Sequence, residues 1–362
     1  MARRTGRFFQ VSCGFMLALL AVSSVSDAFA QKEKPKEPLW THAFDLSCRK
    51  FGEAEFTDKT QKFGVEVFKD TNTGSGLYVS QVGSFAAAGG FDGIKSAIKG
   101  SKGPEWISGL DLPSRKAGEK EFTKDTRVYS MEVFYDANVG NWVYIMNNSS
   151  EKDLKGNVSA TSAPKGVKPA PGNLKAPKWL HSVDLSCRKG GVREWQNAKK
   201  FGIEVYRDNN TGNLIYICDT GAIAVLPDKG ESKSAEGKAP VWLHGLDLYC
   251  RKHNEMDFTK ETHKFGVEVF RDENNGNLIY LSETGDLAVL PSPKPGLPAP
   301  TPSVKEPQWT HGLNLSCRKA GEKEFTPKTR VYGAEVFRDD NTGVTLYLAE
   351  TGSITAIPTP TK

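Results

Sequence analysis

The sequence predicts an all-β protein built from five tandem repeats of about 50 residues. A unit that opens on tryptophan recurs along the chain with spacings of 66, 73, 63 and 67 residues. Each unit begins with strict apolar alternation and continues with two β-branched and aromatic runs around an Asx- and Gly-rich turn, which indicates a hairpin. We therefore expect every repeat to form a small antiparallel sheet of about four strands. The units open at Trp40, Trp106, Trp179, Trp242 and Trp309.

The first strand of each repeat is predicted from period-two alternation. In the fourth repeat one parity holds Trp242, His244, Leu246, Leu248 and Cys250. Successive side chains on a strand point to opposite faces, so these five residues are expected to share one apolar face.

The next segment is a polar loop of the form Gly-Glu-x-Glu-Phe-Thr-x-x-Thr. We expect it to insert one aromatic side chain per repeat into the core. These side chains are Phe56, Phe122, Trp195, Phe258 and Phe325. The hairpin follows, and a Thr-Gly turn leads to a last apolar strand that ends at Pro227, Pro291 or Pro358.

The predicted repeats occupy 38–88, 104–148, 177–227, 240–291 and 307–358. The second is degenerate and is expected to lack its last strand. The segments 149–176, 228–239 and 292–306 have the polar or Pro-rich composition of linkers. Variable joins and a defective second repeat favour a string of small domains, since units of roughly 55–65 residues often fold alone. The alternative is a closed five-bladed β-propeller, whose blades are four-stranded sheets.

Residues 1–30 have the pattern of a signal peptide. Arg3, Arg4 and Arg7 precede a short apolar run, and Ala28-Phe29-Ala30 is a small-residue cleavage site before Gln31. The run is too short and too Ser-rich for a membrane span, so no stable span is expected after cleavage. The predicted location is secreted or periplasmic.

Cysteine usage does not indicate a disulfide framework. Cys48, Cys187, Cys250 and Cys317 occur once per repeat, and only the third repeat has a second one, Cys218. Each lies on the apolar parity of its strand, so we expect buried free thiols.

No catalytic residue, metal site or cofactor is predicted. The recurring His42, His181, His244 and His311 stand six residues from the cysteines on one strand, about 20 Å away, too far to share an ion. The repeated acids are expected to pair across strands with arginines of the same repeat. The Asp-x-Asn-x-Gly turns lack the spacing of an EF-hand loop and fit turn chemistry instead.

The candidate binding residues are basic doublets that could align as a weak polyanion-binding stripe through valency. They are Arg49-Lys50, Arg115-Lys116, Arg188-Lys189, Arg251-Lys252 and Arg318-Lys319. A solvated strand end is the competing interpretation.

These observations favour an exported, non-catalytic repeat protein. It would bind or scaffold multivalently at the cell surface or in the periplasm, with a surface polysaccharide or another envelope component as partner. A secreted hydrolase with a site where the repeats converge, and a purely structural envelope protein, are the alternatives. Residues 1–30 carry three Arg and one Asp, so cleavage lowers the net charge from +5 to +3, which does not argue for nucleic acid.

Overall fold

The computed structural model describes residues 36–49, 53, 55–147, 156–163, 175–228, 238–292 and 305–359. The predicted signal peptide, Cys13 and Lys50 lie outside them. Within these ranges the chain forms twenty strands. They are β1 (Leu39–Cys48), β2 (Gln61–Lys69), β3 (Gly76–Ser80), β4 (Phe85–Ala88), β5 (Glu105–Ser114), β6 (Arg127–Asp136), β7 (Asn141–Asn147), β8 (Gly156–Ser162), β9 (Lys178–Cys187), β10 (Lys199–Asp208), β11 (Asn213–Cys218), β12 (Ile223–Pro227), β13 (Val241–Cys250), β14 (His263–Arg271), β15 (Asn277–Ser282), β16 (Leu287–Pro291), β17 (Gln308–Cys317), β18 (Arg330–Asp339), β19 (Val344–Ala349) and β20 (Ile354–Pro358). No helix among the described residues has the length and apolarity needed to cross a bilayer.

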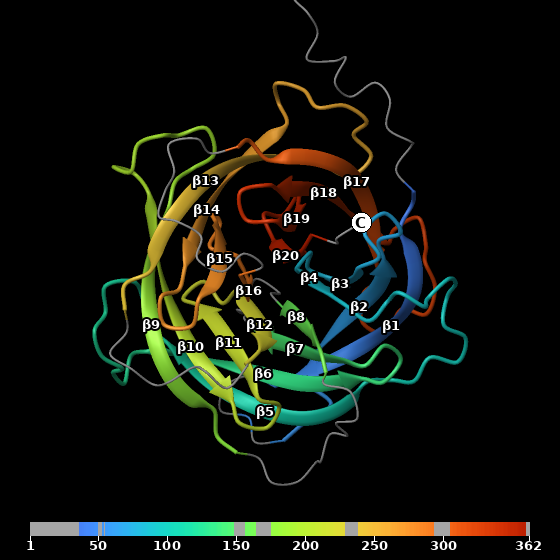
Figure 1. Ribbon diagram of the computed structural model, residues 1–362. Coiled ribbons are helices and arrows are strands. Elements are labelled where there is room, and N and C mark those ends of the chain that lie inside the picture. Colours follow the sequence, from blue (N-terminus) through green and yellow to red (C-terminus); the bar gives the residue numbers. More distant parts are fainter. Residues whose placement is uncertain are drawn as a thin grey trace, which may run out of the picture. The chain divides into compact units, whose positions relative to one another are not determined.

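The strands form five antiparallel four-stranded sheets, one per repeat, each with strand order equal to chain order. We call them blades 1 to 5. Their fourth strands, β4, β8, β12, β16 and β20, contact one another in a closed cycle around the centre (Figure 1). The first strand of blade 5, β17, contacts β2 and β3 of blade 1 and completes the ring. The five repeats and the all-β class are confirmed, and their arrangement is the closed propeller.

The string of independent domains is therefore wrong, and burial shows why. The second and third strands are buried along both faces, as in β14 and β15. A single sheet has no second layer to cover either face, so each face must be buried against another blade. The five hydrophobic clusters accordingly lie at the five seams between blades and not inside single blades.

A β-bulge in each first strand changes the predicted face of the tryptophan. In β1 the register shifts between Trp40, which pairs with Phe68, and His42, which pairs with Val67. The extra residue, Thr41, turns Trp40 to the face opposite His42. Trp40 therefore packs toward blade 5, whereas His42, Leu46 and Cys48 face blade 2. Alternation correctly predicted the shared face of His, Leu and Cys but not the bulge.

The second blade is complete. Its fourth strand, β8, pairs with β7 from Asn141–Ser162 to Asn147–Gly156. This strand lies inside the stretch 149–176 that composition assigned to a linker. The sequence Gly-Asn-Val-Ser-Ala-Thr-Ser consists mostly of small and polar residues, a composition that is typical of a loop.

Candidate functional sites

At the outer rim of every seam, an arginine of one blade pairs with a glutamate of the next. Arg318 Nε lies 2.6 Å from Glu66 Oε1, and Trp40 Nε1 donates to Glu66 Oε2 at 2.7 Å. Glu66 is 2 % exposed. The other four seams repeat this arrangement. Their ion pairs are Arg49–Glu132, Arg115–Glu204, Arg188–Glu268 and Arg251–Glu335. The predicted pairing of these acids and arginines within one repeat is thus replaced by pairing between repeats.

The loop aromatics belong to the same clusters and not to the core. Phe325 meets Trp40 of the next blade edge to face, with ring centroids 6.2 Å apart. The Arg318 guanidinium lies 4.6 Å from the Phe325 centroid. The expected burial is wrong: these side chains are 39–45 % exposed. We call each set a rim cluster. The loop aromatics and their tryptophan partners are Phe56–Trp106, Phe122–Trp179, Trp195–Trp242, Phe258–Trp309 and Phe325–Trp40.

The arginines of the basic doublets take part in the ion pairs between blades. They are the partners of the buried glutamates, and the main chain of the doublets packs closely on the next blade. A Cβ built on Gly64 would lie 2.5 Å from the Arg318 carbonyl oxygen. Four of the lysines, Lys116, Lys189, Lys252 and Lys319, are exposed at the rim clusters.

Deeper in the seams, the histidine of one blade pairs with the turn aspartate of the next. His42 Nε2 lies 2.9 Å from Asp136 Oδ2, and both side chains are fully buried. Three other seams contain His181–Asp272, His244–Asp339 and His311–Asp70. The aspartates also anchor their own turns: Asn72 N–H donates to Asp70 Oδ1 at 2.9 Å. No group of three or more His, Cys, Asp or Glu in the described ranges could hold a metal ion.

Two of these histidines have a hydrogen-bond pattern that fits the doubly protonated ring. The Thr41 hydroxyl donates its one proton to the Val67 carbonyl at 2.8 Å, so its oxygen can only accept from His42 Nδ1–H. Because the Asp136 carboxylate also only accepts, Nε2 donates there. Thr310 and His311 repeat the pattern.

The seam between blades 2 and 3 departs from this design. Ser108 stands in place of histidine and Ser114 in place of cysteine, and both hydroxyl oxygens are buried without a hydrogen-bond partner in the part of the chain that the structure describes. The Trp142 indole N–H is also buried and unpartnered. Its arginine–glutamate pair is retained: Arg115 Nε donates to Glu204 at 2.7 Å.

The five cysteines that the structure describes are buried and unpaired. Cys317 Sγ lies 3.2 Å from the Val79 carbonyl oxygen of the next blade. Burial raises the pKa of Cys218 to about 12 and that of Cys48, Cys187, Cys250 and Cys317 further. The predicted free thiols are confirmed.

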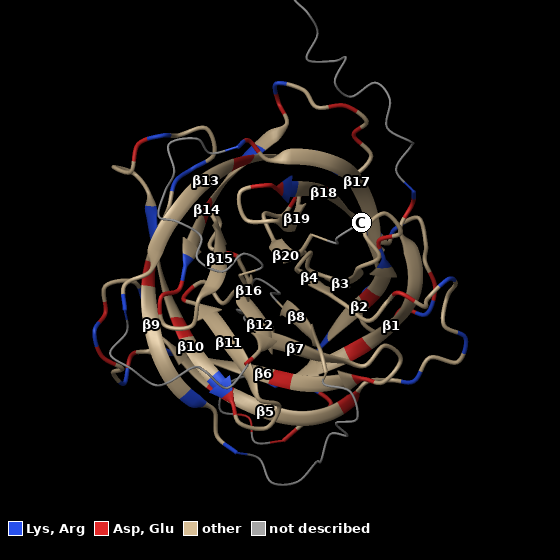
Figure 2. Ribbon diagram, viewed as in Figure 1, with Lys and Arg blue, Asp and Glu red and all other residues tan. Residues whose placement is uncertain are grey.

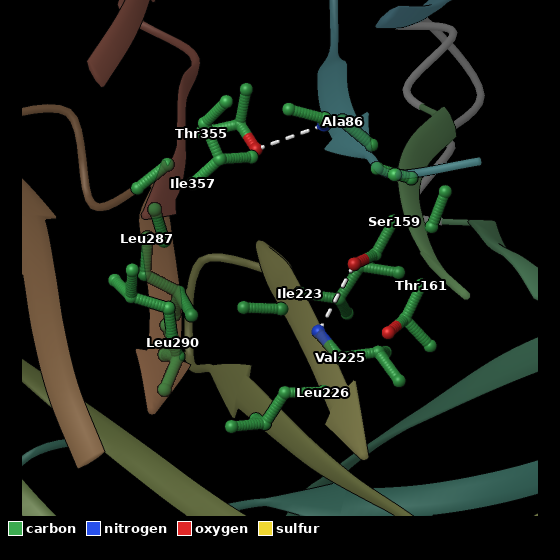
Figure 3. Close-up of a pocket in the computed structure, with 18 of the residues that line it drawn as sticks. Ala86, Ser159, Thr161, Ile223, Val225, Leu226, Leu287, Leu290, Thr355 and Ile357 are labelled. Atoms are coloured by element: carbon green, nitrogen blue, oxygen red, sulfur yellow. Dashed lines mark hydrogen bonds between the residues drawn. The ribbon is translucent and has the colours of Figure 1, made fainter. Parts of the chain in front are cut away.

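The fourth strands enclose a central cavity of about 220 Å³ (Figure 3). Its walls are Ala, Val, Leu, Ile, Ser, Thr and Pro side chains together with Phe85 and Gly89, and the described lining contains no titratable side chain. Ser159 Oγ accepts from Val225 N–H at 3.0 Å, and Thr355 Oγ1 accepts from Ala87 N–H at 3.0 Å. Charged residues lie instead along the outer strands and loops (Figure 2). The described lining therefore contains no His, Asp, Glu, Lys or Cys side chain that could act as a general acid or base beside its Ser and Thr hydroxyls.

Comparison with known proteins supplies no family. No family model matches the chain. None of the curated proteins matches it either. Among solved structures, the chain is similar to a catalytically inactive virginiamycin B lyase from Staphylococcus aureus with quinupristin, at 12 % identity, covering 89 % of this chain and 76 % of that one, with a TM-score of 0.11. A TM-score this low carries no argument about fold or function.

Proposed function

We propose that this chain is an exported, non-catalytic propeller that binds a surface polysaccharide through its five rim clusters. One observation carries the proposal: a half-exposed aromatic ring stands at the same place in all five seams. Every large hydrophobic side chain that is exposed in the described ranges lies on a first strand or on the loop after it. Exposed apolar groups gathered in this way mark interaction surfaces.

The chemistry of a rim cluster suits a sugar. The π face of an aromatic ring is weakly negative and attracts the C–H groups on one face of a pyranose. Exposed Lys319 and Asp45 line one pocket together with Arg318 and Glu66 of this cluster, and they offer a donor and an acceptor for hydroxyl groups. The arginine and glutamate of the cluster are already paired with each other, which leaves the aromatic ring as the main contact.

Repetition multiplies weak binding. A single cluster would bind weakly, but a polymer that engages several clusters gains avidity through effective concentration. The uncharged central cavity supports a non-catalytic role over the hydrolase alternative. The predicted signal peptide supports a secreted or periplasmic location.

The test is a pull-down and a glycan array with the mature chain and with rim variants. Trp195→Ala should weaken binding, and adding Phe122→Ala and Phe325→Ala should weaken it progressively. Trp195→Phe is the matched control, because it restores the residue of the other four repeats. Equal binding by the triple variant would contradict the proposal, as would shortening of the polysaccharide by the chain.

A further inference from the structure

We propose that the seam between blades 2 and 3 binds one small monovalent cation, Na⁺ or K⁺, between Asp208 and Ser108. This inference is independent of the proposed polysaccharide binding. It concerns a site inside the fold that the other four seams fill with a histidine.

Asp208 is a buried carboxylate without a cationic partner among the described residues. It is fully buried, like its four counterparts. Tyr144 and Thr211 donate to its Oδ2 at 3.2 and 2.7 Å, and Asn210 donates to its Oδ1. The counterparts receive equivalent donors and in addition a histidine Nε2 at 2.9–3.1 Å. A buried carboxylate without a compensating charge costs several kcal/mol.

Ser108 is directed at this carboxylate by the register of its strand. It pairs with Val133 directly after the bulge, as His42 pairs with Val67. Its hydroxyl oxygen is buried and has no partner. A serine side chain is shorter than histidine by an imidazole ring, so Ser108 does not supply the group that contacts the aspartate in the other four seams, and a water-sized occupant in its place needs only about 30 Å³.

The ligand atoms around this space decide its chemistry. Asp208 Oδ2, Ser108 Oγ, Thr211 Oγ1 and Tyr144 Oη are all oxygens, which hard cations prefer. A single carboxylate balances one positive charge and does not meet the demand of a divalent ion. Trp142, which stands where blade 3 has Leu214, adds bulk to this seam, which favours a small occupant.

The experiment compares thermal unfolding of the full chain in choline chloride, sodium chloride and potassium chloride at equal ionic strength. A bound ion stabilises the folded state by mass action, so we expect a saturable Tm increase of roughly 2 °C or more in one alkali salt. Ser108→His should abolish this increase, because the imidazole Nε2 then contacts the carboxylate as in the other four seams and occupies the place of the ion. His181→Ser, which creates the same gap in the seam between blades 3 and 4, should add a second salt-dependent increment.

Two results would overturn the proposal. Equal Tm values in all three salts would show that water alone fills the gap. Crystals grown in rubidium chloride should give an anomalous peak between Ser108 Oγ and Asp208 Oδ2, and its absence while Tm still depends on the cation would place the ion elsewhere. This measurement needs no variant and decides the question even if Ser108→His does not fold.

Discussion

Arg318→Ala is expected to destabilise the ring strongly, because it leaves the buried carboxylate of Glu66 without its cationic partner. This pair lies at the seam between blades 5 and 1, which the chain does not connect. In the substituted chain, Glu66 would lose the donors Arg318 Nε at 2.6 Å and Nη2 at 3.2 Å and keep only Trp40 Nε1. Glu66 is 2 % exposed, so water cannot replace them freely.

The expected loss of unfolding free energy follows from the burial of the ion pair. Removing one partner of a buried ion pair costs about 3–5 kcal/mol, whereas an exposed pair contributes roughly 0–1 kcal/mol. The Arg318 side chain is itself 12 % exposed, which permits some access of water, so we expect a value near the lower limit, about 3 kcal/mol.

Urea unfolding monitored by tryptophan fluorescence measures this loss. Arg251→Ala is the matched control, because Arg251 contacts Glu335 at 2.6 and 3.1 Å in a seam whose blades are joined by the chain. The double variant Arg318→Ala/Glu66→Gln should be more stable than Arg318→Ala alone, since it leaves no buried charge. A loss below about 1 kcal/mol, or a double variant less stable than the single one, would refute the reasoning.

Three further predictions concern the thiols, the pH dependence and the isolated blade. The thiols of the native chain should resist alkylation and react fully after unfolding. These thiols are Cys48, Cys187, Cys218, Cys250 and Cys317. Rapid labelling of the native chain would contradict their observed burial. Burial raises the pKa of Asp70 and Asp339, but hydrogen bonds and charge from His311 and His244 outweigh it and lower each pKa to about 2. The two carboxylates therefore stabilise the folded state fully above about pH 4, and this contribution is lost as the pH falls from 4 to 2. Burial raises the pKa of Asp286 to about 6, so its contribution has the opposite sign and stability falls as the pH rises from about 4 to 6; Asp286→Asn should remove that slope from the urea midpoints, and an unchanged slope would argue against it. A fragment covering residues 239–292 should give a collapsed, poorly dispersed NMR spectrum, because both faces of blade 4 are buried against its neighbours, and a well-dispersed spectrum would contradict the seam-based core.

The strands and the hairpins could be predicted because their determinants are local. Alternation fixed the buried face of Leu246, Leu248 and Cys250, and the Asx-Gly turn fixed the connection between β14 and β15. The fourth strand of blade 2 was missed because Gly156–Ser162 lacks the Leu and Ile side chains and the closing Pro of β12, β16 and β20.

The pairing between blades could not be predicted, since every repeat carries the same partners. An arginine in one unit finds an equivalent glutamate in its own unit and in the next, and the pattern alone does not distinguish them. One available indication was the run Phe265-Gly-Val-Glu-Val-Phe270, which is apolar on both parities and therefore needs cover on both faces. That indication favours the ring over the string.

Each blade is a single continuous stretch of chain that enters at the outermost strand and leaves at the innermost one. No strand is exchanged between the first and last repeats, and the seam between blades 5 and 1 has the same ion pair, histidine contact and thiol contact as the seam between blades 4 and 5. The position of the chain ends is consequently arbitrary with respect to the ring. Circular permutation, with residues 359 and 36 joined through a linker of the length that connects the other blades and the chain opened at one of those connections, should preserve the seams described above.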